Sequence, residues 1–415
     1  MGLTLAQKIL AKKSGRAEVT PGEVIYAEPD LVLLYDWPGL DFLMSDIRID
    51  PNKIVLNIDH FFVANSEESA RVHDNFRKIA KKYGIKNFYD VGRSGIGFQL
   101  IAEKGHIRPG TLIMHADAHV STFGALGAYA VGVGGDMMSV FLLGKAWLKV
   151  PGTIKVNVTG KFQKGVTSRD LFEKIEGDLG PDGGTGNVFE FTGPAIADMS
   201  IESRMVLCNS VQYLAADTAI INPDKKTIAY IKAVADEPFD LLRSDADATY
   251  TNILNYDVSS LEPQIVCPPD VYYIKSIKET EGTEINQAFI GTCASGRMED
   301  LRLAARVLKG KRVHPNVRLL ITPITPMIAE QSAREGLIET FLQAGAVIGP
   351  PTCGPCFGGF GYLLPGEVAI TTGTLNVPGR MGSIDAKIYM GNPATVAASA
   401  VEGKISDPRR ILNKR

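Results

Sequence analysis

The chain has 415 residues, of which 45% are hydrophobic and 22% are charged. That length predicts two to four domains or subdomains around a large core. Lysine and arginine number 44 and aspartate and glutamate 46, so the formal net charge is −2, which argues against a nucleic-acid-binding protein. The first residues lack the long apolar core of a signal peptide, and no apolar run is long and uncharged enough to span a bilayer. We therefore expect a soluble, cytoplasmic protein.

Short β-branched runs alternate with helical patterns along the chain. The sequence predicts strands at 53–58, 87–91, 111–115, 153–159, 287–291, 318–321 and 368–372. It predicts helices at 66–83, 168–177, 298–308 and 328–344, and a buried helix in the Gly- and Ala-rich stretch 122–142. The helix at 66–83 is amphipathic with a basic outer face. This alternation is typical of α/β folds, in which ligands bind in the loops that leave the strand ends.

Several chemically active side chains follow predicted strands. Asp59-His60 comes after the strand at 53–58, Asp117-Ala118-His119 after the strand at 111–115, and Cys293 after the strand at 287–291. Because loops at strand ends meet at one edge of a sheet, these side chains are expected in one shared cleft. The Gly-rich stretch 177–187 lacks the Lys-Ser/Thr of a phosphate-binding loop and is expected to be a connection.

Three of the five cysteines lie in turn-rich segments of the C-terminal part. Cys293 lies in Gly-Thr-Cys-Ala-Ser, and Cys353 and Cys356 have CxxC spacing among Pro, Gly and Thr residues. Three thiolates presented from loops can hold three irons of a [4Fe–4S] cluster and leave the fourth iron as an open Lewis-acid site. Cys208 and Cys267 stand in apolar contexts and are expected in the core.

The cysteine spacing alone leaves other uses open. A zinc site would need a fourth ligand nearby, and among the histidines only His314 follows Cys293. A disulfide framework fits poorly with an odd number of cysteines and no secretion signal. Redox chemistry at the CxxC pair would not account for Cys293. His115 and His119, four residues apart, are a weak candidate for a separate metal site, and Trp37 and Trp147 are expected in the core, although Trp37 adjoins Tyr35-Asp36.

The motifs together carry a family resemblance over nearly the whole chain. They include Ile58-Asp59-His60, Gly124–Ala128, Glu202–Met205, Leu207-Cys208-Asn209, Gly291-Thr292-Cys293, the Cys353/Cys356 pair and Pro378–Gly382. The chain resembles the large subunits of 3-isopropylmalate dehydratase and homoaconitase, within the aconitase superfamily. The resemblance implies an α/β fold with three α/β/α domains around a cluster-containing cleft, which we place at residues 1–152, 153–268 and 269–415. It also implies a [4Fe–4S] cofactor held by the three cysteines.

The same resemblance implies a partner. A swivel domain closes over the cluster in this superfamily, and no swivel sequence follows Arg415, so a separate small subunit is expected. The implied reaction removes water from a small hydroxy acid and adds it back. A serine of the swivel domain acts as the base in that reaction, and an acid–histidine pair in the cleft assists the loss of hydroxide.

The resemblance assigns roles to individual residues. The catalytic group implied is Asp59, His60, Asp117 and His119. The substrate-binding group implied at matching positions is Arg380, Asn209, Asn376 and the Tyr35-Asp36 pair, where the family has His-Asp or Gln-Asp. Arg380 matches one of two arginines that bind substrate carboxylates, a role suited to a bidentate guanidinium.

Four other positions depart from the family pattern. Gly95–Gln99 has Phe98 in place of a catalytic histidine, and Ala118 replaces a serine. Tyr213 stands where the family has a glutamate, and Leu375 replaces the second carboxylate-binding arginine. Polar and charged groups are thus replaced by less polar ones, and burying an unpaired carboxylate without its arginine is costly. We therefore hypothesise a hydro-lyase whose substrate has fewer carboxylates or a larger apolar group than isopropylmalate.

Two other functions compete with a hydro-lyase. The open iron could serve sulfur transfer or desulfuration. The loss of the family's histidine and glutamate near the iron favours this function, because those groups handle water. The retained Asp59, His60, His119 and Arg380 argue against it. A non-catalytic cluster sensor is the third hypothesis, and the near-neutral charge argues against an RNA-binding form of it.

Overall fold

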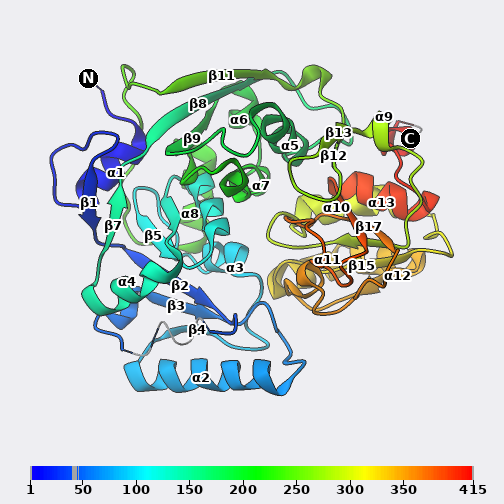
Figure 1. Ribbon diagram of the computed structural model, residues 1–415, viewed down its shortest axis with the longest axis horizontal. Helices are drawn as coiled ribbons and strands as arrows, with labels where there is room; N and C mark the ends of the chain where they lie inside the picture. Colours follow the sequence, from blue (N-terminus) through cyan, green and yellow to red (C-terminus); the bar gives the residue numbers. More distant parts are fainter. Residues whose placement is uncertain (1, 40–43, 45, 414–415) are drawn as a thin grey trace.

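The structure, a computed structural model, describes residues 2–39, 44 and 46–413. Within these residues three larger sheets and one two-stranded ribbon are formed (Figure 1). The ribbon pairs β1 (Val24–Ala27) with β7 (Ala146–Lys149) in antiparallel orientation. The three larger sheets follow one another along the sequence, as the blue-to-red colouring of Figure 1 shows.

The first sheet is parallel and has the strand order β4-β3-β2-β5-β6. Its strands are β2 (Leu31–Tyr35), β3 (Ile54–Asn57), β4 (Asn87–Tyr89), β5 (Leu112–His115) and β6 (Tyr129–Gly132). The helices of this part are α1 (Leu5–Lys13), α2 (Glu67–Tyr83), α3 (Gly97–Glu103) and α4 (Met137–Leu143). Helix α2 lies along one outer edge of the molecule (Figure 1) and buries Val72, His73 and Phe76 while exposing its basic residues, as predicted.

The second sheet, also parallel, has the order β10-β9-β8-β11. Its strands are β8 (Gly152–Thr159), β9 (Asn187–Thr192), β10 (Thr218–Ile221) and β11 (Asn252–Asp257). Its helices are α5 (Ser168–Leu179), α6 (Pro194–Asp198), α7 (Ile201–Asn209) and α8 (Lys225–Val234). Helix α5 contacts α7 and also strand β12 of the third sheet, so it lies between the two sheets.

The third sheet is mixed and has the order β13-β12-β18-β17-β14-β15-β16. Strands β14 to β18 are parallel to one another, whereas β12 is antiparallel to both of its neighbours. The strands are β12 (Gln264–Val266), β13 (Ile274–Ser276), β14 (Gln287–Ile290), β15 (Arg318–Ile321), β16 (Val347–Ile348), β17 (Val368–Thr371) and β18 (Lys387–Met390). The helices are α9 (Ile277–Thr280), α10 (Met298–Leu308), α11 (Pro326–Arg334), α12 (Leu337–Ala344), α13 (Pro393–Glu402) and α14 (Arg409–Leu412).

One hydrophobic core joins the three sheets. It contains Leu33 of the first sheet, Val156 of the second and Ile290 of the third, all fully buried. Cys208 and Cys267 belong to this core, which confirms their predicted packing role. The α/β fold class and the predicted strands are likewise confirmed, with strand ends within two residues of those predicted. The domain boundaries at 152 and 268 remain a prediction.

Two helix predictions are wrong. The stretch 122–142 is not one helix: it contains the end of a 3-10 segment (Ala118–Leu126), strand β6 and most of α4. Gly127 has φ +76° and ends the 3-10 segment. The helix predicted at 328–344 is two helices, α11 and α12, because Gly336 adopts φ +72° between them. A residue in the left-handed region ends an α-helix, and glycine enters that region without steric cost.

Candidate active site

The three predicted cluster cysteines lie at one end of the third sheet. Cys293 follows β14, and Cys353 and Cys356 lie in the loop after β16, with Cys356 in a short 3-10 turn (Gly354–Phe357). Strands β14 and β16 both run parallel to β15, so these two loops leave the same edge of the sheet. All three thiols are buried, with 5 to 7% of each residue exposed.

The turn that presents Cys293 is strained and tightly held. Thr292 has φ +83°, in the region that favours glycine. Its hydroxyl donates to the Thr372 carbonyl at 3.0 Å and accepts from the Ala294 N–H at 3.2 Å. The Arg297 guanidinium donates to the Cys293 carbonyl at 2.9 Å. Backbone strain of this kind is kept where the surrounding contacts over-determine it, and it is common at functional sites.

The electrostatic environment of the three thiols is uneven. Burial, together with the neighbouring sulfur atoms, raises the pKa of Cys293 to about 12 and that of Cys353 well above its ordinary value. Burial would also raise the pKa of Cys356, but the Arg380 guanidinium, 3.6 Å from its sulfur, lowers it instead. Negative charge on each sulfur raises the pKa of its neighbours, so a bound cation would stabilise the thiolate form of all three cysteines. This donor set fits an iron–sulfur cluster.

The Asp59-His60 pair is tied directly to the cysteine loop. The Asp59 carbonyl accepts hydrogen bonds from the Cys353 N–H at 3.1 Å and from the Thr352 hydroxyl at 2.6 Å. The His60 Nδ1 is hydrogen bonded to the Asp59 carboxylate, whose other oxygen accepts the Gly97 N–H at 3.0 Å. Burial lowers the pKa of His60, but the charge and hydrogen bond of Asp59, together with the charges of Asp36 and Asp117, outweigh burial and raise it. The pair is therefore suited to hold a proton on His60.

Asp36 organises the loop that carries this pair. Its carboxylate is fully buried and accepts the N–H groups of Asp59, His60 and Phe61 at 2.7 to 2.9 Å. Its fourth partner is the buried His73 of α2, with 3.1 Å between Nε2 and Oδ2. Burial would raise the pKa of Asp36, and the hydrogen bonds, first that of His73, lower it. Atoms of Asp36, Asp59 and His60 lie within 4.8 Å of one another, close enough for metal ligands, but these hydrogen bonds already use them.

The second predicted acid–histidine pair faces the same region. His119 Nδ1 lies 2.9 Å from the Asp117 carboxylate, and its Nε2 lies 3.3 Å from the Tyr213 hydroxyl. Tyr35 donates to Asp117 at 2.8 Å and stacks on His60 with 4.3 Å between ring centroids. Burial would raise the pKa of Asp117, but the His119 charge lowers it strongly. Tyr35 thus links the two pairs.

One side of the candidate site is apolar. Phe98 is buried and contacts the rings of His115 and His119, at centroid distances of 5.4 and 6.2 Å. Burial lowers the pKa of His115 to about 4, and its Nδ1 accepts the Asp117 N–H at 2.7 Å. His115 is therefore a neutral residue that positions the Asp117 backbone, and its Nδ1 is not free to bind a metal.

A second group of aromatic rings surrounds His60. Phe357, next to Cys356, stacks on His60 at 5.4 Å, and Trp37 meets the same imidazole edge-on at 5.2 Å. Phe61 contacts both Trp37 and Phe357. We call Trp37, Phe61 and Phe357 the aromatic wall. Trp37 is 37% exposed and Trp147 is 52% exposed, so the prediction that both lie in the core is wrong.

The remaining predicted substrate residues divide into two groups. Asn209 lies beside Cys293, with 3.8 Å between Oδ1 and Sγ. Tyr213 packs on Val266, Val271 and Met390, and so does Leu375, which stands in place of an arginine and was not predicted to bind substrate. Asn376 is buried, and its amide nitrogen donates to the carbonyls of Cys267 and Ile388, while its Oδ1 has no partner. His73, the buried partner of Asp36, was not among the residues predicted for the site.

Comparison with known proteins places the chain. The family model described as "Aconitase family (aconitate hydratase)" matches residues 43–280 and 270–403. The chain is 42% identical to 3-isopropylmalate dehydratase large subunit 1 of Methanopyrus kandleri, over 99% of this chain and 100% of that protein. It is 43% identical to the 3-isopropylmalate dehydratase large subunit of Heliobacterium modesticaldum, over the same shares of the two chains.

The chain belongs to the aconitase family. The crystal structure of Thermococcus kodakaraensis aconitase X aligns with a TM-score of 0.46 at 13% identity, covering 84% of each chain. The dehydratase names of the relatives confirm the predicted enzyme class, a hydro-lyase. Among the described helices, none has the length and apolar character that crossing a membrane requires.

Proposed function

We propose that this aconitase-family chain is the catalytic large subunit of a hydro-lyase that dehydrates and rehydrates a small hydroxy acid. One observation carries the proposal: three buried thiols lie beside two acid–histidine pairs, Asp59-His60 and Asp117/His119. The Thr352 and Cys353 hydrogen bonds to Asp59 support a common centre, because they join the thiol loop to the first pair.

Cys293, Cys353 and Cys356 are the residues that would hold a [4Fe–4S] cluster. When bound by three cysteines, such a cluster supplies an open iron that acts as a Lewis acid toward a hydroxyl or carboxylate. The Arg380 guanidinium lies beside Cys356 with its buried Nε unpartnered, so it can bind a substrate carboxylate at the same place.

The two acid–histidine pairs divide the proton chemistry. Asp59 favours the protonated form of His60, which can give a proton to a departing hydroxide. Asp117 orients His119 through Nδ1 and leaves Nε2 toward the Tyr213 hydroxyl. The base that removes the carbon-bound proton is expected from a small swivel subunit, and the large-subunit names of the relatives support such a partner.

The pocket favours a substrate that is less carboxylated or more apolar than isopropylmalate. The family pattern has two arginines that bind carboxylates, and here Arg380 is present while Leu375 stands at the second position. Leu375 packs with Tyr213 on an apolar cluster. Phe98 and the aromatic wall add apolar surface next to His119 and His60. Burial of one methylene contributes about 0.8 kcal/mol, so a substrate alkyl group against this surface would gain affinity.

The test is Mössbauer spectroscopy of the anaerobically reconstituted large subunit with its small subunit, with and without a panel of hydroxy acids and sulfide. A single distinct iron whose signal moves with an apolar monocarboxylic hydroxy acid supports the proposal. Turnover of isopropylmalate at ordinary dehydratase rates would refute the altered specificity. A signal that responds only to sulfide would indicate sulfur chemistry, and zinc in place of iron would exclude both.

A further inference from the structure

Two glutamates with no role in the site described so far are buried on helix α5. Glu173 and Glu176 are each 2% exposed, and their spacing puts them on one face of the helix. Arg169, one turn before Glu173, donates from Nε to its carboxylate at 2.7 Å. The other two nitrogens of Arg169 donate to the carbonyls of Thr372 and Gly373, so each of its three nitrogens has a partner. Arg169 therefore bonds Glu173 and acts on Glu176 through its charge.

The pair has unfilled hydrogen-bonding capacity. Oε2 of Glu173 and Oε1 of Glu176 are buried without a partner. Glu173 and Glu176 both line a small cavity of about 20 Å³, together with Arg169, Tyr213, Thr374 and Ala294 among others. That volume holds about one water molecule. The wall is mostly apolar, and Glu173, Glu176, Ser210 and Tyr213 are residues in it that offer hydrogen-bond partners.

The small cavity lies between the glutamate pair and the candidate active site. Tyr213 forms part of its wall, and the Tyr213 hydroxyl lies 3.3 Å from His119 Nε2. His119 is in turn bonded to Asp117. Hydroxyl, imidazole and water groups pass protons along hydrogen bonds without themselves becoming stable ions, so this order of groups can conduct a proton.

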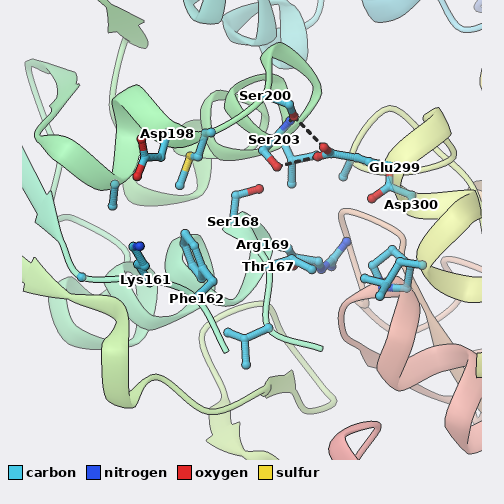
Figure 2. Close-up of a pocket in the computed structure, with 18 of the residues that line it drawn as sticks. Lys161, Phe162, Thr167, Ser168, Arg169, Asp198, Ser200, Ser203, Glu299 and Asp300 are labelled. Carbon is cyan, nitrogen blue, oxygen red and sulfur yellow. Dashed lines mark hydrogen bonds between the residues drawn. The ribbon is translucent and has the colours of Figure 1, made fainter. Parts of the chain in front are cut away.

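A larger cavity adjoins the small one. It has a volume of about 340 Å³ and shares Arg169, Val206 and Ala294 with the walls of the small cavity. Figure 2 shows its hydroxyl-rich interior, with Ser168 and Ser203 pointing into it and Glu299 bonded to Ser200 and Ser203. Neither glutamate lines this cavity, so Arg169, Val206 and Ala294 stand between it and the pair.

We propose that Glu173 and Glu176 form a proton store for the candidate active site and exchange protons with it through the small cavity, Tyr213 and His119. The inference rests on the proposed hydro-lyase function. In dehydration the C–H electron pair forms the C=C bond and the C–O pair leaves with hydroxide. The hydroxide takes a proton within the site and becomes water, and the store replaces that proton. The base releases the C–H proton to solvent, and the store regains one proton from solvent.

The charged groups around Glu173 and Glu176 favour the protonated form of both carboxyl groups near neutral pH. Burial raises the pKa of Glu173 to about 8 and that of Glu176 to about 9, and each is raised further by a neighbouring carboxylate. The groups that face the pair from the adjoining segments are Arg169, Asp170, Cys267, Asp270 and Tyr272. Of these, Arg169 is the cation, so the surroundings favour the neutral acids.

The first test uses the protein without cofactor. Infrared spectroscopy should show a protonated carboxyl band at pH 7 that weakens above about pH 8 and is reduced in both Glu173→Gln and Glu176→Gln. The wild-type Tm should fall as pH rises from about 6 to 9, because the folded state holds more protons than the unfolded state. Glu176→Gln should flatten that fall. Asp217→Asn is the control, since burial raises the pKa of Asp217 to about 6 only. No carboxyl band at pH 7 would overturn the store.

The second test uses the reconstituted enzyme with its small subunit. We expect Glu173→Gln and Glu176→Gln to lower kcat about tenfold with KM unchanged, and to move the alkaline limb of the kcat profile. Asp217→Asn should leave both constants unchanged. Wild-type dehydratase activity that neither glutamate variant alters would overturn the proton store. A wild-type protein that shows the carboxyl band but dehydrates no hydroxy acid would instead overturn the proposed function.

Discussion

The Arg380 guanidinium lies 3.6 Å from the sulfur of Cys356, measured from Nη2 to Sγ. Of the three site thiols, Cys356 is the one whose pKa this contact lowers, whereas burial raises the pKa of Cys293 and Cys353. The arginine therefore favours the thiolate form of Cys356 in the folded chain. Binding of a substrate carboxylate is the second role that we propose for it.

Arg380→Gln should make Cys356 a weaker acid. Each unit of pKa changes the thiolate fraction tenfold, so we expect alkylation of the cofactor-free protein at pH 7 to slow by about tenfold. Mass spectrometry of the labelled peptide containing Cys353 and Cys356 measures this directly. Arg410→Gln, which removes a surface arginine paired with Glu281, is the matched control. Equal alkylation in wild type and Arg380→Gln would contradict the role of the contact.

Asp36→Ala should destabilise the fold strongly. It removes the acceptor of three buried N–H groups and the partner of His73, which we expect to cost about 3 kcal/mol or more. Urea unfolding followed by circular dichroism checks the value. Asp46→Ala removes an exposed carboxylate of the same region and should change the free energy of unfolding by less than about 0.5 kcal/mol. A small effect for both variants would show that the loop does not depend on Asp36.

His115 should stay neutral until the solution is distinctly acidic. Burial lowers its pKa to about 4, whereas a histidine in the unfolded chain titrates near about 6.5. Between these values the unfolded state binds more protons, so the free energy of unfolding falls as pH falls through that window. NMR of ¹⁵N-histidine-labelled protein, with His115→Asn to assign the signal, should show no protonation at pH 6. A midpoint near 6.5 would refute the prediction.

Leu375 and Tyr213 should be energetically coupled, because they pack on the same apolar cluster. Leu375→Arg alone places a second guanidinium in an apolar cluster and should destabilise the protein by about 2 kcal/mol. Adding Tyr213→Glu supplies the opposite charge, and the double variant should recover about 1 kcal/mol relative to the sum of the single changes. A thermal double-mutant cycle measures the coupling. Additive effects would mean that the two departures from the family pattern arose independently.

The sequence predicts the regular elements well where one period dominates. Helix α10 begins and ends at the predicted residues, because its apolar face repeats without interruption over Met298–Leu308. The helix predicted at 122–142 was wrong because its Gly and Ala residues occur in helices, strands and turns alike. There, a Cβ on Gly124 would lie 1.8 Å from the Ala219 carbonyl oxygen, so the small side chain serves contact with β10 rather than a helix.

The site was predictable to the extent that its residues fall in motifs. The cysteines, Asp59-His60 and Asp117/His119 all stand at strand ends and meet as expected. His73 was missed because its partner Asp36 is 37 residues away, and a single histidine on the buried face of a helix carries no pattern. Glu173 and Glu176 were missed for a related reason: two acids on a helix resemble a solvated face until tertiary packing buries them.

The hydrogen bond from Thr352 to the Asp59 carbonyl spans 293 residues of sequence. During synthesis the first sheet leaves the ribosome long before the loop that completes its acid–histidine pair. The nascent chain therefore carries Asp59 and His60 without their thiol neighbours until most of the polypeptide has been made. Assembly of the candidate site is therefore expected to be one of the last steps in the folding of the newly made chain.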